Sequence, residues 1–152
     1  MFYEHPVPID LAIHYVRGNL LVSGTPSYNN REYLPIQAIN GAKGYNNKFG
    51  GLFPKQDEKE FFLTLEFPRK PVSIDGYAIQ TADDEIQPEH WCFYITEVDQ
   101  NGKQLQERVV DEQLDTTARN RWETSEYLFG KEYLVSKVTL KIYASTKNFA
   151  EC

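Results

Sequence analysis

The sequence is poor in cysteine and methionine and has no long apolar run. Its two cysteines, Cys92 and Cys152, are too few for a disulfide framework. Cys92 lies in a strand-like segment and Cys152 is the last residue, so we expect both to be unpaired, which points weakly to a reducing compartment. No apolar stretch approaches the roughly 18 residues that span a bilayer, and the N-terminus lacks the basic and apolar regions of a signal peptide. We therefore expect a cytoplasmic or virion-associated protein rather than a secreted one.

Basic residues are also scarce. The 16 Lys and Arg are outnumbered by 22 Asp and Glu, which gives a formal net charge of −6 at pH 7. Such a chain is repelled by a phosphate backbone and by an anionic membrane, so neither nucleic acid nor a membrane is an expected partner. Aromatic residues make up 14% of the chain. Because they fit the pleated, half-buried surface of a sheet, this composition favours a β-protein over a helical bundle.

One domain accounts for the whole chain, because the sequence contains no internal repeat, low-complexity tract or linker. A chain of 152 residues has the length of one ordinary domain. We expect that domain to span residues 1–152. Residues 1–9, which include Pro6 and Pro8, are predicted as an extended lead-in, and residues 147–152 as a tail.

Apolar and polar residues alternate in four segments, which is the pattern of half-buried strands. These segments are 61–67, 72–79, 91–97 and 137–143. The alternation changes phase at Asp75-Gly76, as a β-bulge requires. In the last segment, the side chains of residues 137, 139 and 141 are expected to face solvent.

Turn signals separate the predicted strands. Arg17-Gly18-Asn19 predicts a hairpin within residues 11–23, and Asn101-Gly102 a turn into a strand near 105–110. Residues 24–56 are rich in turn formers, with the best candidate for a short helix at 34–42, and residues 111–126 are predicted as a polar loop. Roughly eight strands and no convincing helix predict an all-β fold, an antiparallel β-sandwich or jelly roll.

Five segments, taken in order, carry a family resemblance. They span residues 38–41, 60–67, 77–91, 99–102 and 138–145. In the third, Tyr77-Ala-Ile-Gln-Thr-Ala-Asp-Asp, followed by Pro88 and Trp91, resembles a Tyr-x-Leu-x-Thr-Ala-x-Asp, Pro, Trp pattern. In this order the segments resemble the discoidin domain, also called the coagulation-factor C-type module, of the galactose-binding-like jelly rolls. The resemblance covers about residues 20 to 146.

This resemblance implies a jelly roll that binds sugars, lipid head groups or protein partners through loops at one end. Members often hold a structural calcium near the early turn, where this chain has Asn40 in place of the usual Asp. A neutral amide binds a hard cation less tightly than a carboxylate does. The cysteines that staple extracellular members are missing. We therefore expect no cofactor, with calcium disfavoured at Asn40, and no metal site.

One polar loop holds the first group of candidate ligand-binding residues. Trp122 stands beside Arg119 and Arg121, whose guanidinium groups are suited to donating paired hydrogen bonds to hydroxyls or a carboxylate. The indole of Trp122 offers a face on which a sugar ring can stack. The alternative is structural: Trp122 covers the end of the barrel and Arg121 pairs with Glu123 or another acid. Trp91, by contrast, alternates with apolar residues and is predicted to lie in the core.

A second loop supplies the remaining candidates, Tyr45, Asn46 and Asn47. Their hydroxyl and amide groups both donate and accept hydrogen bonds, as sugar hydroxyls require. The same residue types are also ordinary turn formers, so a solvated loop is the alternative.

No pattern in the sequence indicates catalysis or a metal centre. The three histidines, His5, His14 and His90, are interpreted as scattered, without a Cys or carboxylate at metal-ligand spacing. Residues 83–85 are acidic but lack the alternating spacing of a calcium loop, and no phosphate loop or nucleophile elbow is present.

We therefore expect a recognition module that is not an enzyme and that binds carbohydrate through loops at one end. The alternative is a structural or protein–protein interaction domain of a larger assembly, such as a homo-oligomer, a virion or tail component, or an intracellular complex.

Overall fold

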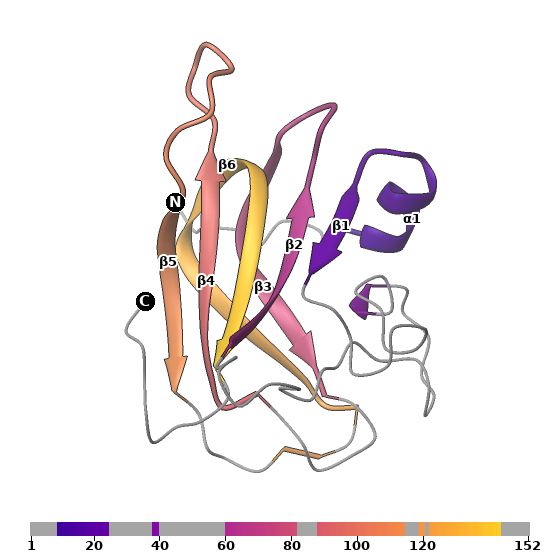
Figure 1. The fold of residues 1–152 in the computed structure, drawn as a ribbon, viewed down its shortest axis with the longest axis vertical. Helices are drawn as coiled ribbons and strands as arrows, with labels where there is room; N and C mark the ends of the chain where they lie inside the picture. The colour runs from indigo at the N-terminus through magenta and orange to yellow at the C-terminus, as the bar shows by residue number, and fades with distance from the viewer. Residues whose placement is uncertain are drawn as a thin grey trace, which may run out of the picture.

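The structure is a computed structural model that describes residues 9–24, 38–39, 60–81, 88–114, 119–120 and 122–143. These residues form one short helix and six strands (Figure 1). In chain order they are α1 Leu11–Val16, β1 Leu21–Gly24, β2 Glu60–Glu66, β3 Val72–Gln80, β4 His90–Glu97, β5 Arg108–Leu114 and β6 Thr124–Tyr143. No helix in this part of the chain is long and apolar enough to cross a membrane.

Every strand pair is antiparallel, and β6 links two sheets. The larger sheet consists of β1, β2, the last part of β6, β4 and β5, and the smaller one of β3 and the first part of β6. The strand order is β1-β2-β6-β4-β5, and β3 pairs with β6. The first part of β6 pairs with β3, and its last part lies between β2 and β4. β6 therefore rises along β3, turns over and descends into the larger sheet (Figure 1). The expected antiparallel β-sandwich is confirmed.

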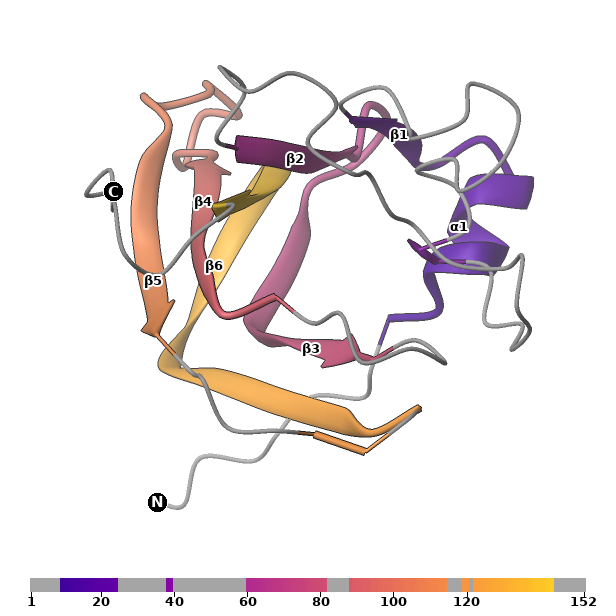
Figure 2. The same cartoon turned by 60° about the horizontal axis from the view of Figure 1, so that its bottom comes forward.

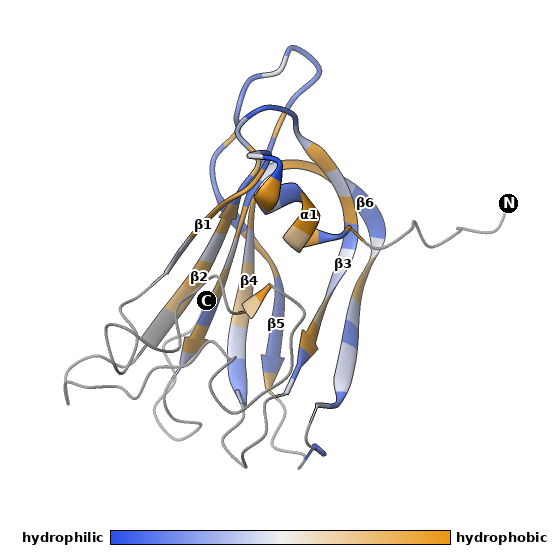
Figure 3. Ribbon diagram, turned by 90° about the vertical axis from the view of Figure 1, so that its right-hand side faces the viewer, coloured by the Kyte–Doolittle hydropathy of each residue, from blue (hydrophilic) through white to orange (hydrophobic). Residues whose placement is uncertain are grey.

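The core lies between the two sheets. Phe93 and Ile95 of β4 and Val135 and Val138 of β6 form its buried centre. Residues of every described strand except β1 pack against this centre, and Figure 3 shows the alternation of apolar and polar residues that puts them there. Trp91 is fully buried, so its predicted place in the core is confirmed. Burying each such side chain contributes about 1.5–3 kcal/mol.

The phase change predicted at Asp75-Gly76 is confirmed, and the extra residues lie on the partner strand. The register of β3 and β6 shifts between Ile74 and Gly76, and residues 129–132 of β6 have no partner in the ladder. Gly130, with φ +79°, lies within this bulge, where β6 turns over. A side chain at Gly76 would overlap the carbonyl oxygen of Tyr127, so the close approach of the two backbones requires glycine there.

The predicted turn at Asn101-Gly102 is also confirmed, although the strand that follows begins later, at Arg108. One carboxylate oxygen of Asp99 accepts hydrogen bonds from the backbone N–H groups of Asn101 (2.8 Å) and Lys103 (2.9 Å). Gly102 supplies the positive φ, +79°, that the turn needs. This turn projects from the end of the molecule at the top of Figure 1.

The predicted hairpin within residues 11–23 is wrong. Residues 11–16 form α1, and only the residues after it form a strand. Asp10 caps the helix, because its carboxylate accepts a hydrogen bond from the N–H of Ile13 (3.0 Å). Gly18, with φ +73°, ends it in the left-handed conformation. The helix lies on the open side of the sandwich between β1 and β3 (Figures 2 and 3).

Two predictions about the C-terminal half are also wrong. Residues 111–114 and 124–126 are strand rather than loop, because their backbones complete the ladders to β4 and β3 although most of their side chains are polar. Thr139, predicted to face solvent, is buried and its hydroxyl lies 3.1 Å from that of Thr64 on β2. This pair satisfies two polar groups on the covered outer face of the larger sheet.

Cys92 is disulfide-bonded, which corrects the expectation of an unpaired thiol. The only other cysteine in the sequence is Cys152, which lies outside the described residues. A disulfide is typical of oxidising compartments. The argument for a reducing compartment from free thiols therefore no longer holds.

Candidate functional site

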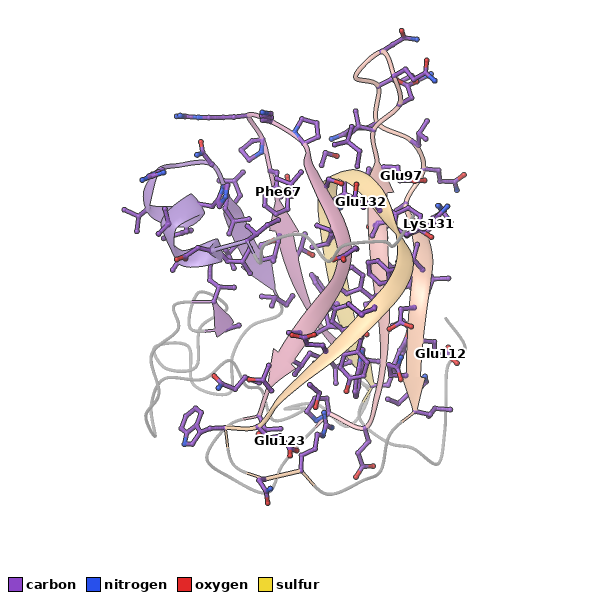
Figure 4. All side chains as sticks on the ribbon, turned by 180° about the vertical axis from the view of Figure 1, so that it is seen from behind. Phe67, Glu97, Glu112, Glu123, Lys131 and Glu132 are labelled. Carbon is purple, nitrogen blue, oxygen red and sulfur yellow. The ribbon has the colours of Figure 1, made fainter. Side chains whose placement is uncertain are left out.

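One end of the sandwich brings together the ends of all six strands. β1, β3, β5 and β6 finish at this end, and β2, β4 and the long first part of β6 begin there (Figures 1 and 2). Figure 4 labels Glu123 at this end and Phe67, Glu97 and Glu132 toward the other. We call it the Glu123 end. Its described residues outside the strands are Thr81, Pro88, Glu89, Arg119, Asn120, Trp122 and Glu123.

Thr81 holds the segment that leads into β6. Its backbone N–H donates to the carbonyl of Glu123 (2.9 Å), and its hydroxyl donates to the carbonyl of Asn120 (2.6 Å). The same hydroxyl accepts a hydrogen bond from the N–H of Glu123 (2.9 Å). Since Thr81 is buried, these bonds form in a low-dielectric setting that strengthens them. The end of β3 thus fixes both sides of the turn at residues 120–123.

Trp122 occupies the left-handed region of backbone space, with φ +59°. The N–H of Glu123 donates to the carbonyl of Asn120 (3.3 Å), which closes the turn around Trp122. The side-chain amide of Gln80 donates to the carbonyl of Trp122 (3.1 Å). A non-glycine residue in this conformation costs about 1–2 kcal/mol and persists where its surroundings hold it, often at ligand-binding positions.

Arg119 is half-buried and anchors the same end to β4. Its guanidinium donates to the backbone carbonyl of Pro88, two residues before the start of β4, and its central carbon lies 5.5 Å from the centroid of the Trp91 ring. A cation over an indole face is a favourable contact, worth about 2 kcal/mol when desolvated. Part of the hydrogen-bonding capacity that the sequence assigned to a ligand is therefore used to position the loop.

A polar network lies beneath the Glu123 end, on three strands. The indole N–H of Trp91 donates to the hydroxyl of Tyr77 (2.8 Å), which in turn donates to the carboxylate of Asp111 (2.6 Å). The amide of Gln113 also donates to this carboxylate (3.2 Å). Burial raises the pKa of the Tyr77 phenol well above its usual range, and the hydrogen bond to Asp111 acts in the same direction. The tyrosine is therefore a fixed donor at neutral pH.

The structure brings two of the predicted ligand-binding residues to one end. Arg119 and Trp122 both lie there, on either side of Asn120. Arg121, Tyr45, Asn46 and Asn47 lie outside the described residues, as do Asn40, the acidic run 83–85 and most of the predicted helix at 34–42. Sequence reasoning missed the roles of Gln80 and Thr81. The available signal was the Thr of the family pattern, which is residue 81 here.

His90 does not stand apart from metal-ligating side chains, contrary to the expectation from the sequence. It is the first residue of β4 and lies on the outer face of the larger sheet with Cys92. The carboxylate of Glu112, on β5, is 3.9 Å from its Nε2 atom. Folding brings these residues together because strand positions two apart share a face and Glu112 is the cross-strand partner of Cys92.

No protein-family model and no curated protein matches this chain. Solved structures do match it. A family 32 carbohydrate-binding module of NanJ from C. perfringens, in complex with galactose, aligns with a TM-score of 0.62 at 14% identity, over 86% of this chain and 87% of that one. A second family 32 module from Clostridium perfringens, in complex with GalNAc-β-1,3-galactose, gives 0.55 at 14% identity, over 86% and 88%.

Enzymes are also among the similar structures. Allantoicase from Saccharomyces cerevisiae aligns with a TM-score of 0.61 at 13% identity, over 90% of this chain but 39% of that one. This chain therefore corresponds to one part of that enzyme, whereas it matches the two modules over most of their length. At these identities the likeness establishes the fold.

Proposed function

Starting from a galactose-binding-like jelly roll of the discoidin type, we propose that this protein is a non-catalytic module that binds carbohydrate at the Glu123 end. The single observation that carries the proposal is the match to a galactose-bound module over 86% of this chain and 87% of that one. A fold hosts many functions, so the ligand class has to be supported by the residues of the site.

The chemistry of the Glu123 end suits a sugar. Trp122 is held in a fixed backbone conformation by Gln80 and by the turn that Thr81 secures. A pre-positioned aromatic residue binds a ligand with less loss of conformational entropy than a mobile one. In our proposal Trp122 stacks on a sugar ring and Arg119 positions the loop and donates to a hydroxyl.

The other proposed ligand-binding residues are Arg121, Tyr45, Asn46 and Asn47. They would add donors and acceptors for the remaining sugar hydroxyls. Because such shallow sites bind weakly, we expect a dissociation constant on the order of 1 mM, equivalent to about −4 kcal/mol. Useful affinity would then come from several copies acting together.

Titration of the chain with galactose and with GalNAc-β-1,3-galactose, followed by NMR, tests the proposal. The expected result is saturable shifts, with at least tenfold weaker binding for Trp122→Ala. Tyr15→Ala is the matched control, because Tyr15 is an exposed aromatic residue on α1, away from the Glu123 end. A glycan array without hits, together with an unchanged thermal midpoint in high galactose, would refute carbohydrate binding.

A second candidate function is a protein-interaction domain of a larger assembly. α1 supports it, because Ile13 and Tyr15 are each nearly half exposed and Val16 is 83% exposed. Three exposed apolar side chains on a six-residue helix form an apolar surface of the kind that often marks a protein-interaction site. Light scattering should then show an oligomer that Val16→Ser weakens, whereas a monomer at all concentrations would remove the case for self-association.

A further inference from the structure

Three metal-ligating side chains meet on the outer face of the larger sheet, away from the loop of Trp122. His90 and Cys92 come from β4 and Glu112 from β5, and one ligand atom of each lies within 4.8 Å of the others. Figure 4 shows Glu112 on β5, well removed from Glu123. His90 and Cys92 are buried, while the side chain of Glu112 is 44% exposed. We call this group the His-Cys-Glu cluster. Solvent reaches it at the side chain of Glu112.

The spacing of these atoms is close to that of a tetrahedral site. Zn²⁺ bonds of about 2.0 Å to nitrogen and oxygen and 2.3 Å to sulfur place neighbouring ligand atoms about 3.3–3.6 Å apart. Here the Nε2 atom of His90 is 3.9 Å from Glu112, and the sulfur of Cys92 is 3.7 Å from the same carboxylate oxygen. These two distances are slightly longer than those of a bound site and all three ligand atoms lie within 4.8 Å of one another, so metal binding requires small movements of the partly exposed Glu112 and of His90 and Cys92.

The neighbours of the cluster favour a fixed imidazole. The ring of Tyr143 stacks on that of His90, with centroids 4.7 Å apart and planes 26° apart. Lys141, the cross-strand neighbour of Cys92 on β6, places its ammonium 5.0 Å from the centroid of the Tyr94 ring. Lys141 thus has an aromatic partner of its own. A thiolate and a carboxylate together balance the charge of a divalent ion.

The disulfide decides whether the sulfur is available. Cys92 is disulfide-bonded, so its sulfur carries no proton to donate, and its 3.7 Å separation from Glu112 is a contact rather than a hydrogen bond. A thiolate, not a disulfide sulfur, is the metal ligand. Metal binding and the disulfide therefore exclude each other.

We propose that the reduced chain binds Zn²⁺ through His90, Cys92 and Glu112, with water in the fourth position, and that oxidation of Cys92 abolishes this site. An external dithiol or phosphine supplies the two electrons and is itself oxidised. Cleavage of the S–S bond, with uptake of two protons, leaves one thiol on Cys92 and one on its partner. On metal binding the Cys92 thiol releases its proton to the buffer and forms the S–Zn bond.

Cobalt binding by the full-length chain tests this proposal, because Co²⁺ reports a thiolate ligand by a charge-transfer band. Cys152→Ser leaves Cys92 as the only cysteine in the chain. This variant should bind one Co²⁺ with a sulfur-to-metal band that stoichiometric Zn²⁺ removes. The phosphine-reduced wild type should do the same, and the oxidised wild type should not. Zn²⁺ should also raise the thermal midpoint of Cys152→Ser in a concentration-dependent way.

Further substitutions in the Cys152→Ser background identify the ligands. Glu112→Gln should weaken Zn²⁺ binding at least tenfold, since loss of even an outer-shell partner costs about 10–100-fold. Glu89→Gln, an exposed carboxylate one residue before His90, is the matched control and should leave the affinity unchanged. Cys92→Ser should abolish the band while circular dichroism shows a folded chain. A folded Cys152→Ser that binds no metal, or a Co²⁺ complex without the thiolate band, would overturn the proposal.

Discussion

Gly76 is the residue at which sequence pattern and backbone geometry coincide most closely. The phase change in the alternation locates a bulge there, and the structure adds the reason why the position takes no side chain. The carbonyl of Tyr127 and the Cα atom of Leu128 (3.1 Å from an added Cβ atom) both belong to the partner backbone, which cannot move without breaking the ladder.

Gly76→Ala is therefore expected to reduce the free energy of unfolding by about 3 kcal/mol, the upper part of the range for overpacking. Gly102→Ala is the control, because it has positive φ but nothing within 4 Å of an added Cβ atom. It should cost about 1 kcal/mol. Urea denaturation measures both, and equal losses would show that backbone conformation rather than overlap determines the cost.

Tyr77 gives a second prediction at the scale of one residue. Tyr77→Phe leaves the indole N–H of Trp91 and the carboxylate of Asp111 without their hydroxyl partner. We expect a loss of about 2 kcal/mol at pH 7. Tyr15→Phe controls for removal of an exposed hydroxyl and should have no effect on stability.

The stability difference between wild type and Tyr77→Phe should also depend on pH. Because the folded-state pKa of Tyr77 is raised, the unfolded chain loses this proton above pH of about 10 while the folded chain keeps it. The contribution of the hydroxyl is complete below that pH and declines above it, by about 1.4 kcal/mol per pH unit. Urea denaturation between about pH 8 and 11 checks this, and parallel curves for the two proteins would contradict it.

At the scale of elements, the turn before β6 depends on Thr81, the residue that follows β3. Thr81→Val keeps the shape of the side chain but removes its hydrogen bonds to Asn120 and Glu123. We expect a loss of about 2 kcal/mol in stability and weaker binding of any ligand that contacts Trp122. Thr124→Val, at an exposed position nearby, is the control. Unchanged NMR shifts around Trp122 in Thr81→Val would mean that the turn does not need this hydroxyl.

The sequence predicts elements well where burial alternates and poorly where it does not. The alternating segments became β2, β3, β4 and the end of β6. The polar stretch around Glu112 gave no such signal, because β5 holds its place by backbone pairing to β4 at the edge of the sheet. Helix α1 was mispredicted for another reason. The sequence Arg17-Gly18-Asn19 is typical of a hairpin turn, but here Asp10 caps the start of a helix and Gly18 ends it.

The candidate site was predictable only in part, for a similar reason. Trp122 and Arg119 stood out by residue type in a polar loop, but the residues that hold them are ordinary. Thr81 gains its role from a hydrogen bond to Asn120, 39 residues away in the sequence. A contact between residues so far apart cannot be predicted from local sequence patterns. The His-Cys-Glu cluster likewise requires knowing that β4 and β5 pair in register at Cys92 and Glu112.

On the scale of the whole molecule, β6 ties the two sheets into one cooperative unit. Among the described strands its first part supplies the only partner of β3, and its last part is central in the larger sheet. We therefore expect the two sheets to unfold together. In Trp122→Phe, where Trp91 is the only indole, urea unfolding followed by fluorescence and by far-UV circular dichroism should give one shared midpoint. Two distinct midpoints would mean that the bulge at residues 129–132 uncouples the sheets.

The projecting turn at Asn101-Gly102 gives this molecule a natural handle. It lies at the end opposite Glu123 (Figures 1 and 4), and Asp99 holds its tip through hydrogen bonds to Asn101 and Lys103. A peptide tag inserted there would let the chain be grafted onto a bead with every copy in the same orientation. If the proposed function holds, a dense coating would present the proposed sites as an array, and glycan capture would rise steeply with grafting density.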